Sequence, residues 1–168
     1  MLKTCARINR DAGTGSLWLG DGYEAQLAFA EREGDPGALA CLHGVRSRVH
    51  PFDLSQALTR RATLTREWFA FLDKYPVLLM PVSGELPFPD HLDRKDEASF
   101  ARVWHAQLPQ IAIPFMGLPG LVVSTGLVGR IPVGVQLVAA RYREDLCLAA
   151  GEAIEAAGTP SSPIDPVV

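Results

Sequence analysis

The sequence contains no long apolar run, and none of its apolar stretches approaches the roughly 18–20 residues that a membrane span needs. Its first residues, MLKTCARINRDAGTGS, include basic side chains but no apolar core, so they do not predict a secretory signal peptide. We therefore expect no membrane contact and a cytoplasmic location.

Cysteine and lysine are both scarce. The three cysteines, Cys5, Cys41 and Cys147, are far apart and contain no CxxC pair, which predicts reduced thiols rather than disulfides or a metal site. Neither Lys74 nor Lys95 lies in the apolar surroundings that would lower its pKa enough for a catalytic base.

The sequence also has no large excess of positive or negative charge. Sixteen basic and nineteen acidic residues give a formal net charge of −3, and the arginines form no stripe interleaved with aromatic residues. This balance excludes an electrostatic reason for binding nucleic acid. With 168 residues, 48% of them apolar, the chain is long enough for one domain with a sizeable core.

Hydrophobic periodicity predicts helices that alternate with short strands. Helices are expected over residues 21–33, 38–43, 55–74, 93–108 and 143–157, and strands over 77–82, 121–125 and 133–138. The proline-bounded VLLMPV run at 77–82 is typical of a strand buried on both faces of a sheet. The sequence thus predicts an α/β fold at 21–168, with a mixed β-sheet and flanking helices, after an irregular lead-in at 1–20.

Two of these helices have predicted inner faces. The 55–74 helix begins with Ser55 as a candidate N-cap and the 143–157 helix ends before Gly158, a candidate C′ residue. In the first helix the predicted stripe is Leu58, Ala62, Phe69 and Leu72, broadened by Leu64, Trp68 and Phe71, and in the second it is Leu146, Ala149, Ala150, Ala153, Ile154 and Ala157.

Two short motifs resemble known sites incompletely. Ser124 lies in VVSTG, half of a G-x-S-x-G nucleophile elbow, but the first glycine is absent and a strand follows instead of a helix. Gly13-Thr14-Gly15 opens like a dinucleotide-binding loop, but Trp18 occupies the third glycine position and no strand precedes it. We therefore predict an ordinary strand residue and an ordinary loop.

The polar clusters predict no metal or cofactor site. The acidic segment Asp90–Glu97 lacks ligand spacing, which favours a solvated loop that caps a helix over an oxygen-rich metal site. His43 and His105 stand alone and favour structural roles. A His50–Asp53 dyad has no supporting motif, and Ser161-Ser162 lies in a proline-rich tail without a base.

The most specific pattern lies between Ile111 and Pro166. It consists of the Gly117-Leu118-Pro119-Gly120 turn, a β-branched strand, the PVGVQLV strand at 132–138, an alanine-rich helix and the final PIDP. This pattern resembles the C-terminal end of the amidase-signature family, which hydrolyses linear amides and includes the A subunit of glutamyl-tRNA amidotransferases. The resemblance implies that residues 21–168 are a C-terminal α/β portion of that fold.

The resemblance places the chemistry outside this chain. Members of the family use a serine nucleophile, a second serine joined by a cis peptide bond, and a lysine base, within an upstream glycine- and serine-rich stretch. This sequence has no such stretch, so no catalytic residue is assigned and the isolated chain is expected to be inactive. Many members also carry an asparagine where Pro114 stands here. The predicted loop at Pro114–Gly117 offers Phe115 and Met116 as substrate contacts, with core packing as the alternative.

Three interpretations remain open: the C-terminal part of an amidase, a non-catalytic remnant that folds as an oligomer, and a complete small hydrolase that uses Ser124 or a histidine. The first includes a free amidase and an amidotransferase A-like subunit, and its parent would bind a small amide substrate. Uncovered sheet edges and apolar faces predict a homo-oligomer for the isolated chain.

Overall fold

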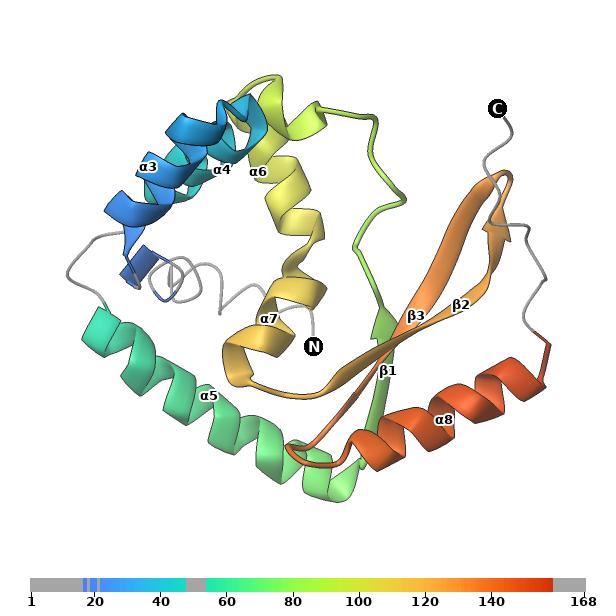
Figure 1. Ribbon diagram of the computed structural model, residues 1–168. Helices are drawn as coiled ribbons and strands as arrows, with labels where there is room; N and C mark the ends of the chain where they lie inside the picture. Colours follow the sequence, from blue (N-terminus) through green and yellow to red (C-terminus); the bar gives the residue numbers. More distant parts are fainter. Residues whose placement is uncertain (1–16, 18, 21, 48–53, 159–168) are drawn as a thin grey trace.

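The computed structural model describes residues 17, 19–20, 22–47 and 54–158. Its elements are α3 (Tyr23–Glu33), α4 (Pro36–Arg46), α5 (Leu54–Lys74), β1 (Val77–Pro81), η1 (Leu92–Arg94), α6 (Glu97–Ala106), α7 (Leu108–Met116), β2 (Gly120–Val128), β3 (Ile131–Ala139) and α8 (Glu144–Ala156) (Figure 1). Of the predicted lead-in at 1–20, the structure describes only Leu17, Leu19 and Gly20, which have helical backbone. None of the described helices is both long and apolar enough to cross a membrane.

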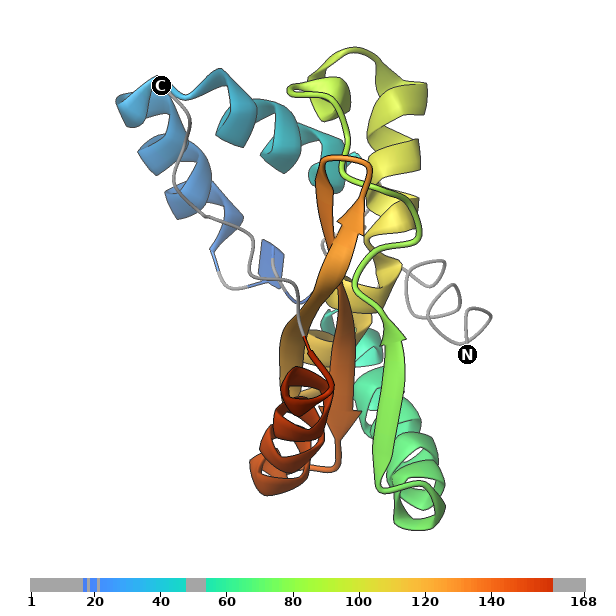
Figure 2. The same cartoon turned by 90° about the vertical axis from the view of Figure 1, so that its right-hand side faces the viewer.

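The three strands form one sheet in the order β1-β3-β2, and both strand pairs are antiparallel. β2 and β3 form a hairpin whose turn contains Gly129 at φ +64, a conformation that favours glycine. β1 pairs with the other side of β3, with Val77 opposite Ala139. The hairpin extends well beyond the end of β1 (Figure 2). The predicted α/β class is confirmed.

Helix α8 covers one face of the sheet, mainly over β2 and β3. Cys147 is buried there against Leu137, and Gly151 allows close approach, because a Cβ on Gly151 would lie 2.7 Å from Leu121 Cδ2. The predicted helix and its C′ glycine, Gly158 at φ +99, are confirmed. The predicted inner face was wrong in part, since three of its alanines are exposed: Ala149, Ala153 and Ala157.

Helices α5 and α7 cover the other face, where Leu64, Met116 and Val138 form the centre of the largest apolar cluster. The predicted inner face of α5 is confirmed in part, because Leu64, Trp68 and Leu72 are buried. Its other members are exposed: Leu58, Ala62, Phe69 and Phe71. The residues that are buried on α5 are Ala57, Leu64, Thr65, Trp68 and Leu72. α5 also begins at Leu54, so Ser55 lies inside the helix.

The single helix predicted at 93–108 is three elements: η1, α6 and the start of α7. Asp96 caps α6 by accepting a hydrogen bond from the Ser99 backbone N–H at 2.7 Å. At the other end, Gln107 has φ −84 and ψ 2, which leaves helical geometry just before Pro109 enters the first turn of α7. The chain therefore changes direction between α6 and α7. Farther upstream, α4 extends beyond the predicted 38–43 at both ends.

The predicted loop at Pro114–Gly117 is instead the last turn of α7. Gly117, at φ +65, ends the helix in a Schellman motif: its N–H bonds to the Pro114 carbonyl at 3.0 Å, and the Leu118 N–H bonds to the Ile113 carbonyl at 3.2 Å. Leu118 and Ile113 also share the main apolar cluster. Pro114 lies inside this helix with its side chain exposed.

The prediction that the VLLMPV strand is buried on both faces was wrong for Leu79. Met80 points into the α5–α7 cluster and is 3% exposed, but Leu79 is 56% exposed. The reason is that α8 lies over β2 and β3 and makes few contacts with β1. β1 is an edge strand with one covered face.

Candidate binding groove

An open groove of about 720 Å³ lies between the far half of the β2–β3 hairpin and the segment that follows β1. This segment runs between the hairpin and α6 (Figures 1 and 2). The apolar lining comes from Pro81, Val82, Leu86, Pro87, Phe88, Val122, Pro132 and Val133. The polar side chains of the lining are Ser83, Glu85, Gln107, Gln110 and Ser124.

Hydrogen bonds connect one wall of the groove, the segment after β1, to the end of α6. The Gly84 N–H donates to the Ala106 carbonyl at 2.7 Å, and the Ser83 hydroxyl donates to the same oxygen at 3.3 Å. Since a carbonyl oxygen has two lone pairs, it can accept both bonds. These contacts hold the proline-rich wall in place next to the α6–α7 junction.

An ion pair between Glu85 and Arg102 also connects this wall to α6. Arg102 on α6 donates to both carboxylate oxygens of Glu85, with the shortest contact at 2.6 Å, and its guanidinium lies 5.8 Å from the centre of the Phe88 ring. The hydrogen bond from Arg102 lowers the pKa of Glu85 below its ordinary value of 4.5. Glu85 is therefore ionised and paired, so it adds little net charge to the groove.

The floor of the groove is one face of the hairpin. Val122 is 57% exposed there, and Ser124 lies one pleat farther along β2, opposite Gly134. The strands approach closely at this point, because a Cβ on Gly134 would lie 2.6 Å from the Val123 carbonyl oxygen. A bulge between Ser124 and Gly126 then shifts the register. Gly134 adds no side chain to this floor.

These groups define what the groove can hold. The carboxamides of Gln107 and Gln110 and the hydroxyls of Ser83 and Ser124 can each donate and accept hydrogen bonds. The remaining lining is apolar, and the one charge is paired with Arg102. The arrangement suits a small neutral molecule with an apolar body and a polar end.

The predicted substrate contacts lie elsewhere. Phe115 and Met116 are 4% and 0% exposed and belong to the main apolar cluster, which confirms the core-packing alternative. Neither lines the groove. Contact of either residue with a substrate stays a prediction.

The structure brings Ser124 into the groove but supplies no partner that would activate it. It is an exposed residue of β2, and within the described ranges its hydroxyl has no hydrogen bond to a histidine or lysine. The same ranges contain no cis peptide bond. The geometry agrees with the prediction of an ordinary strand residue.

The other polar residues considered as candidates do not come together in a common site among the described residues. The described part of the chain holds no group of three or more metal-ligating side chains, and Asp96 of the acidic segment serves as a helix cap. His43 lies 3.5 Å from the Tyr23 hydroxyl, and His105 is exposed in the last turn of α6. His50, Asp53, Ser161, Ser162 and the Gly13–Gly15 segment lie outside the described residues.

Sequence reasoning missed the groove itself. Its polar groups come from segments as far apart as Ser83, Gln107 and Ser124. The available signal was the cluster of prolines directly after a strand, which produces an extended segment without regular structure.

Comparison with known proteins now assigns the chain to a family. The profile of the Amidase family matches residues 44–148, which include the groove wall, the α6–α7 junction and the hairpin. This chain therefore belongs to the Amidase family.

Two kinds of relative are similar to it. Indoleacetamide hydrolase of Bradyrhizobium japonicum is 40% identical over 119 residues, which cover 67% of this chain and 25% of the relative. The A subunit of glutamyl-tRNA(Gln) amidotransferase of Desulforudis audaxviator is 29% identical over 100 residues, which cover 60% of this chain and 20% of the relative. The crystal structure of the corresponding protein from Thermotoga maritima aligns with a TM-score of 0.49 and 20% identity over 83% of this chain and 28% of that one. The chain spans about a quarter of the length of the curated relatives.

Proposed function

We propose that this chain is the C-terminal part of an amidase-family hydrolase, and that its groove receives the apolar body of a small amide. The observation that carries the proposal is the 40% identity to an indoleacetamide hydrolase across two thirds of the chain. The apolar, charge-balanced groove is compatible with a neutral aromatic amide. The lower identity of 29% to the amidotransferase protein makes a fragment of an A-like subunit the second candidate.

The proposal separates binding from bond cleavage. Hydrolysis of an amide adds water across the C–N bond and releases a carboxylic acid and ammonia. In the proposed parent enzyme a serine nucleophile, a bridging serine and a lysine base perform this step, as the family resemblance implies. The groove residues would position the substrate and keep water from its apolar part. We also propose a cytoplasmic location for the parent, because its cysteines in this chain are few and lack the spacing of a disulfide framework.

Binding of indole-3-acetamide to the full 168-residue chain tests the proposal. We expect saturable binding by calorimetry, and we expect Val122→Arg to abolish it, because a long charged side chain would fill the floor of the groove. The matched control is Leu148→Arg, an equally exposed apolar position on α8 that lies away from the groove. Equal loss of binding in both variants, or no binding by the unmodified chain, would count against the groove.

An activity-based probe tests the second half of the proposal. We expect the chain to release no ammonia from indole-3-acetamide and to take up no fluorophosphonate. Labelling of Ser124, abolished in Ser124→Ala, would show instead that the chain is a complete small hydrolase.

A further inference from the structure

Two guanidinium groups converge at the end of α7. A Cβ built on Gly117 would lie 3.1 Å from Arg141 Nη2 and 3.2 Å from Arg61 Nη2, so the two groups flank the same small space. Gly117 itself is exposed, which opens this space to solvent. Neither arginine lines the groove described above. The pair is a separate feature of the molecule.

Arg141 is held rigidly from three sides. Its Nη2 donates to the Met116 carbonyl at 2.9 Å and its Nε donates to the Gly117 carbonyl at 3.2 Å. Its guanidinium also lies 5.7 Å from the centre of the Phe69 ring on α5. The bonds to carbonyls at the C-terminus of α7 favour a cation there, because that end of a helix carries partial negative charge. Other N–H groups of the same guanidinium remain for a ligand.

Among the described residues, Arg61 has no such partners. Its Nε is buried without a hydrogen-bond partner, and within the described ranges neither Arg61 nor Arg141 pairs with a carboxylate. The Nη2 atoms of Arg61 and Arg141 both lie next to the position of a Cβ on Gly117, and the Arg141 guanidinium also packs against Phe69 on the same helix as Arg61. Two like charges this close repel each other unless an anion lies between them.

We propose that Arg61 and Arg141 bind a carboxylate in the space above Gly117. A guanidinium presents a planar fork of N–H donors that matches the two oxygens of a carboxylate. A singly charged anion suits the site better than a dianion, because the end of α7 already offsets part of the positive charge. Gly117 is part of the site, since any side chain there would occupy the ligand position.

The carboxylate has two possible sources with the same chemistry: a free small molecule, or an aspartate or glutamate side chain of another copy. NMR spectra of the Arg Nε–H groups of the full chain test both. The probe is sodium acetate, titrated against sodium chloride at equal ionic strength. We expect the Arg61 and Arg141 signals to shift saturably with acetate and not with chloride. If the same signals shift when only the protein concentration is raised, the carboxylate belongs to a second copy.

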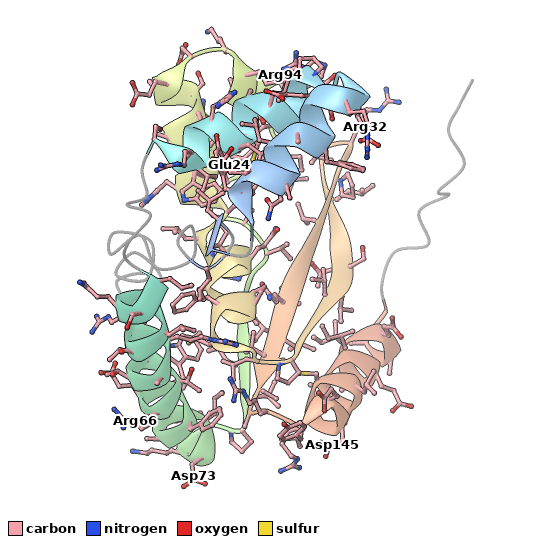
Figure 3. All side chains as sticks on the ribbon, turned by 60° about the vertical axis from the view of Figure 1, so that its left-hand side comes forward. Glu24, Arg32, Arg66, Asp73, Arg94 and Asp145 are labelled. Carbon is pink, nitrogen blue, oxygen red and sulfur yellow. The ribbon has the colours of Figure 1, made fainter. Side chains whose placement is uncertain are left out.

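Substitutions make the test specific. Arg61→Gln should weaken acetate binding at Arg141 by roughly tenfold or more, since it removes one of two charged donors. Arg61→Lys keeps the charge but loses the fork, so we expect intermediate binding. The matched control is Arg66→Gln, because Arg66 lies on the outer side of the same helix (Figure 3) and should leave binding unchanged.

Three results would overturn the proposal. The first is a shift that does not saturate or that chloride reproduces, and the second is unchanged acetate binding in Arg61→Gln. The third is tighter binding of phosphate than of acetate at matched ionic strength. Thermal unfolding of each variant, recorded alongside, distinguishes a lost ligand contact from a misfolded protein.

Discussion

At the scale of single residues, Gly134 lies where the backbone of the neighbouring strand comes close. Its missing side chain lets the β2 backbone approach, and a Cβ would come within 2.6 Å of a carbonyl oxygen of the neighbouring strand. Because that obstacle is backbone and not the end of a flexible side chain, the strands would have to separate to admit a methyl group. The family pattern PVGVQ contains this glycine at a position that no propensity scale would favour in a strand.

We expect Gly134→Ala to lower the free energy of unfolding by about 1–3 kcal/mol, the range for overpacking in a tight site. Urea denaturation followed by circular dichroism measures the change. Ser124→Ala is the control, since it removes an exposed hydroxyl opposite the same glycine and should change stability by less than about 0.5 kcal/mol. Equal stability of Gly134→Ala and the parent chain would mean that the strands do not pack this closely.

Glu85 gives the groove wall a dependence on pH. The pKa of Glu85 is lowered in the folded protein by its hydrogen bond with Arg102, so the pair stabilises the fold above the ordinary pKa of 4.5. The contribution is lost as the pH falls below 4.5 through the lowered folded value. We therefore expect the unmodified chain to have a larger free energy of unfolding than Glu85→Gln at pH 7, and we expect this difference to vanish in acid. It should also shrink with added salt, since both side chains are partly exposed. A difference that is independent of pH would refute this role.

At the scale of elements, α8 shows how small residues set the distance between a helix and a sheet. Cys147 and Gly151 are its two buried residues, and the Cys147 thiol lies 3.7 Å from the Leu137 carbonyl oxygen. Burial raises the pKa of this thiol, with a smaller contribution from Glu144. Because the thiolate is the reactive form, docking of α8 should make Cys147 inert.

In a Cys5→Ser, Cys41→Ser variant, Cys147 is the remaining thiol, and we expect it to react with a disulfide reagent at neutral pH only after α8 detaches. Reaction should therefore accelerate in urea in parallel with unfolding. A Cys5→Ser, Cys147→Ser variant leaves the exposed Cys41 as its one thiol and reports the reactivity of Cys41 for comparison. Rapid reaction of Cys147 in the folded protein would show that α8 is not held on the sheet.

The existence and order of the long elements could be predicted from the sequence. The faces that each helix buries, and some of the residues at which elements begin and end, could not. Periodicity located α5 and α8, yet it identified their inner faces only in part, because several positions on each helix are apolar and only packing decides which are covered. Pro109 and Pro114 are both accommodated in α7, one in its first turn and one on its exposed side. Gly117 followed by apolar Leu118 was the available indication that a helix ends there.

The partners of distant segments were beyond single-sequence reasoning. Nothing local in Val77–Pro81 indicates that this strand pairs with β3, or that it lies at an edge. The groove and the arginine pair have the same origin, since each joins side chains that are far apart along the chain. Such sites follow from the tertiary arrangement rather than from motifs.

At the scale of the whole molecule, the sheet has two edges and incomplete cover among the described residues. Leu79 on β1 and Val122 on β2 are each more than half exposed. Open edges and exposed apolar side chains favour association. We expect the isolated chain to form dimers or larger oligomers by light scattering, and we expect Leu79→Glu to shift the mass towards the monomer. Leu58→Glu, an exposed apolar position of α5, is the control. A monodisperse monomer over a wide concentration range would disprove self-association.

The central strand β3 pairs with one strand that is close to it in the sequence, β2, and with one that is far from it, β1. We expect these two pairings to form at different rates. β2 reaches β3 through a short turn, and hairpins of this kind form within about 1–10 μs. β1 pairs with β3 only after the chain between Val82 and Arg130 has been brought into a closed loop, which carries a larger entropic cost. We therefore expect the hairpin to form first and β1 to join the sheet later. Substitutions in the hairpin should therefore slow folding, whereas substitutions in β1 should mainly accelerate unfolding.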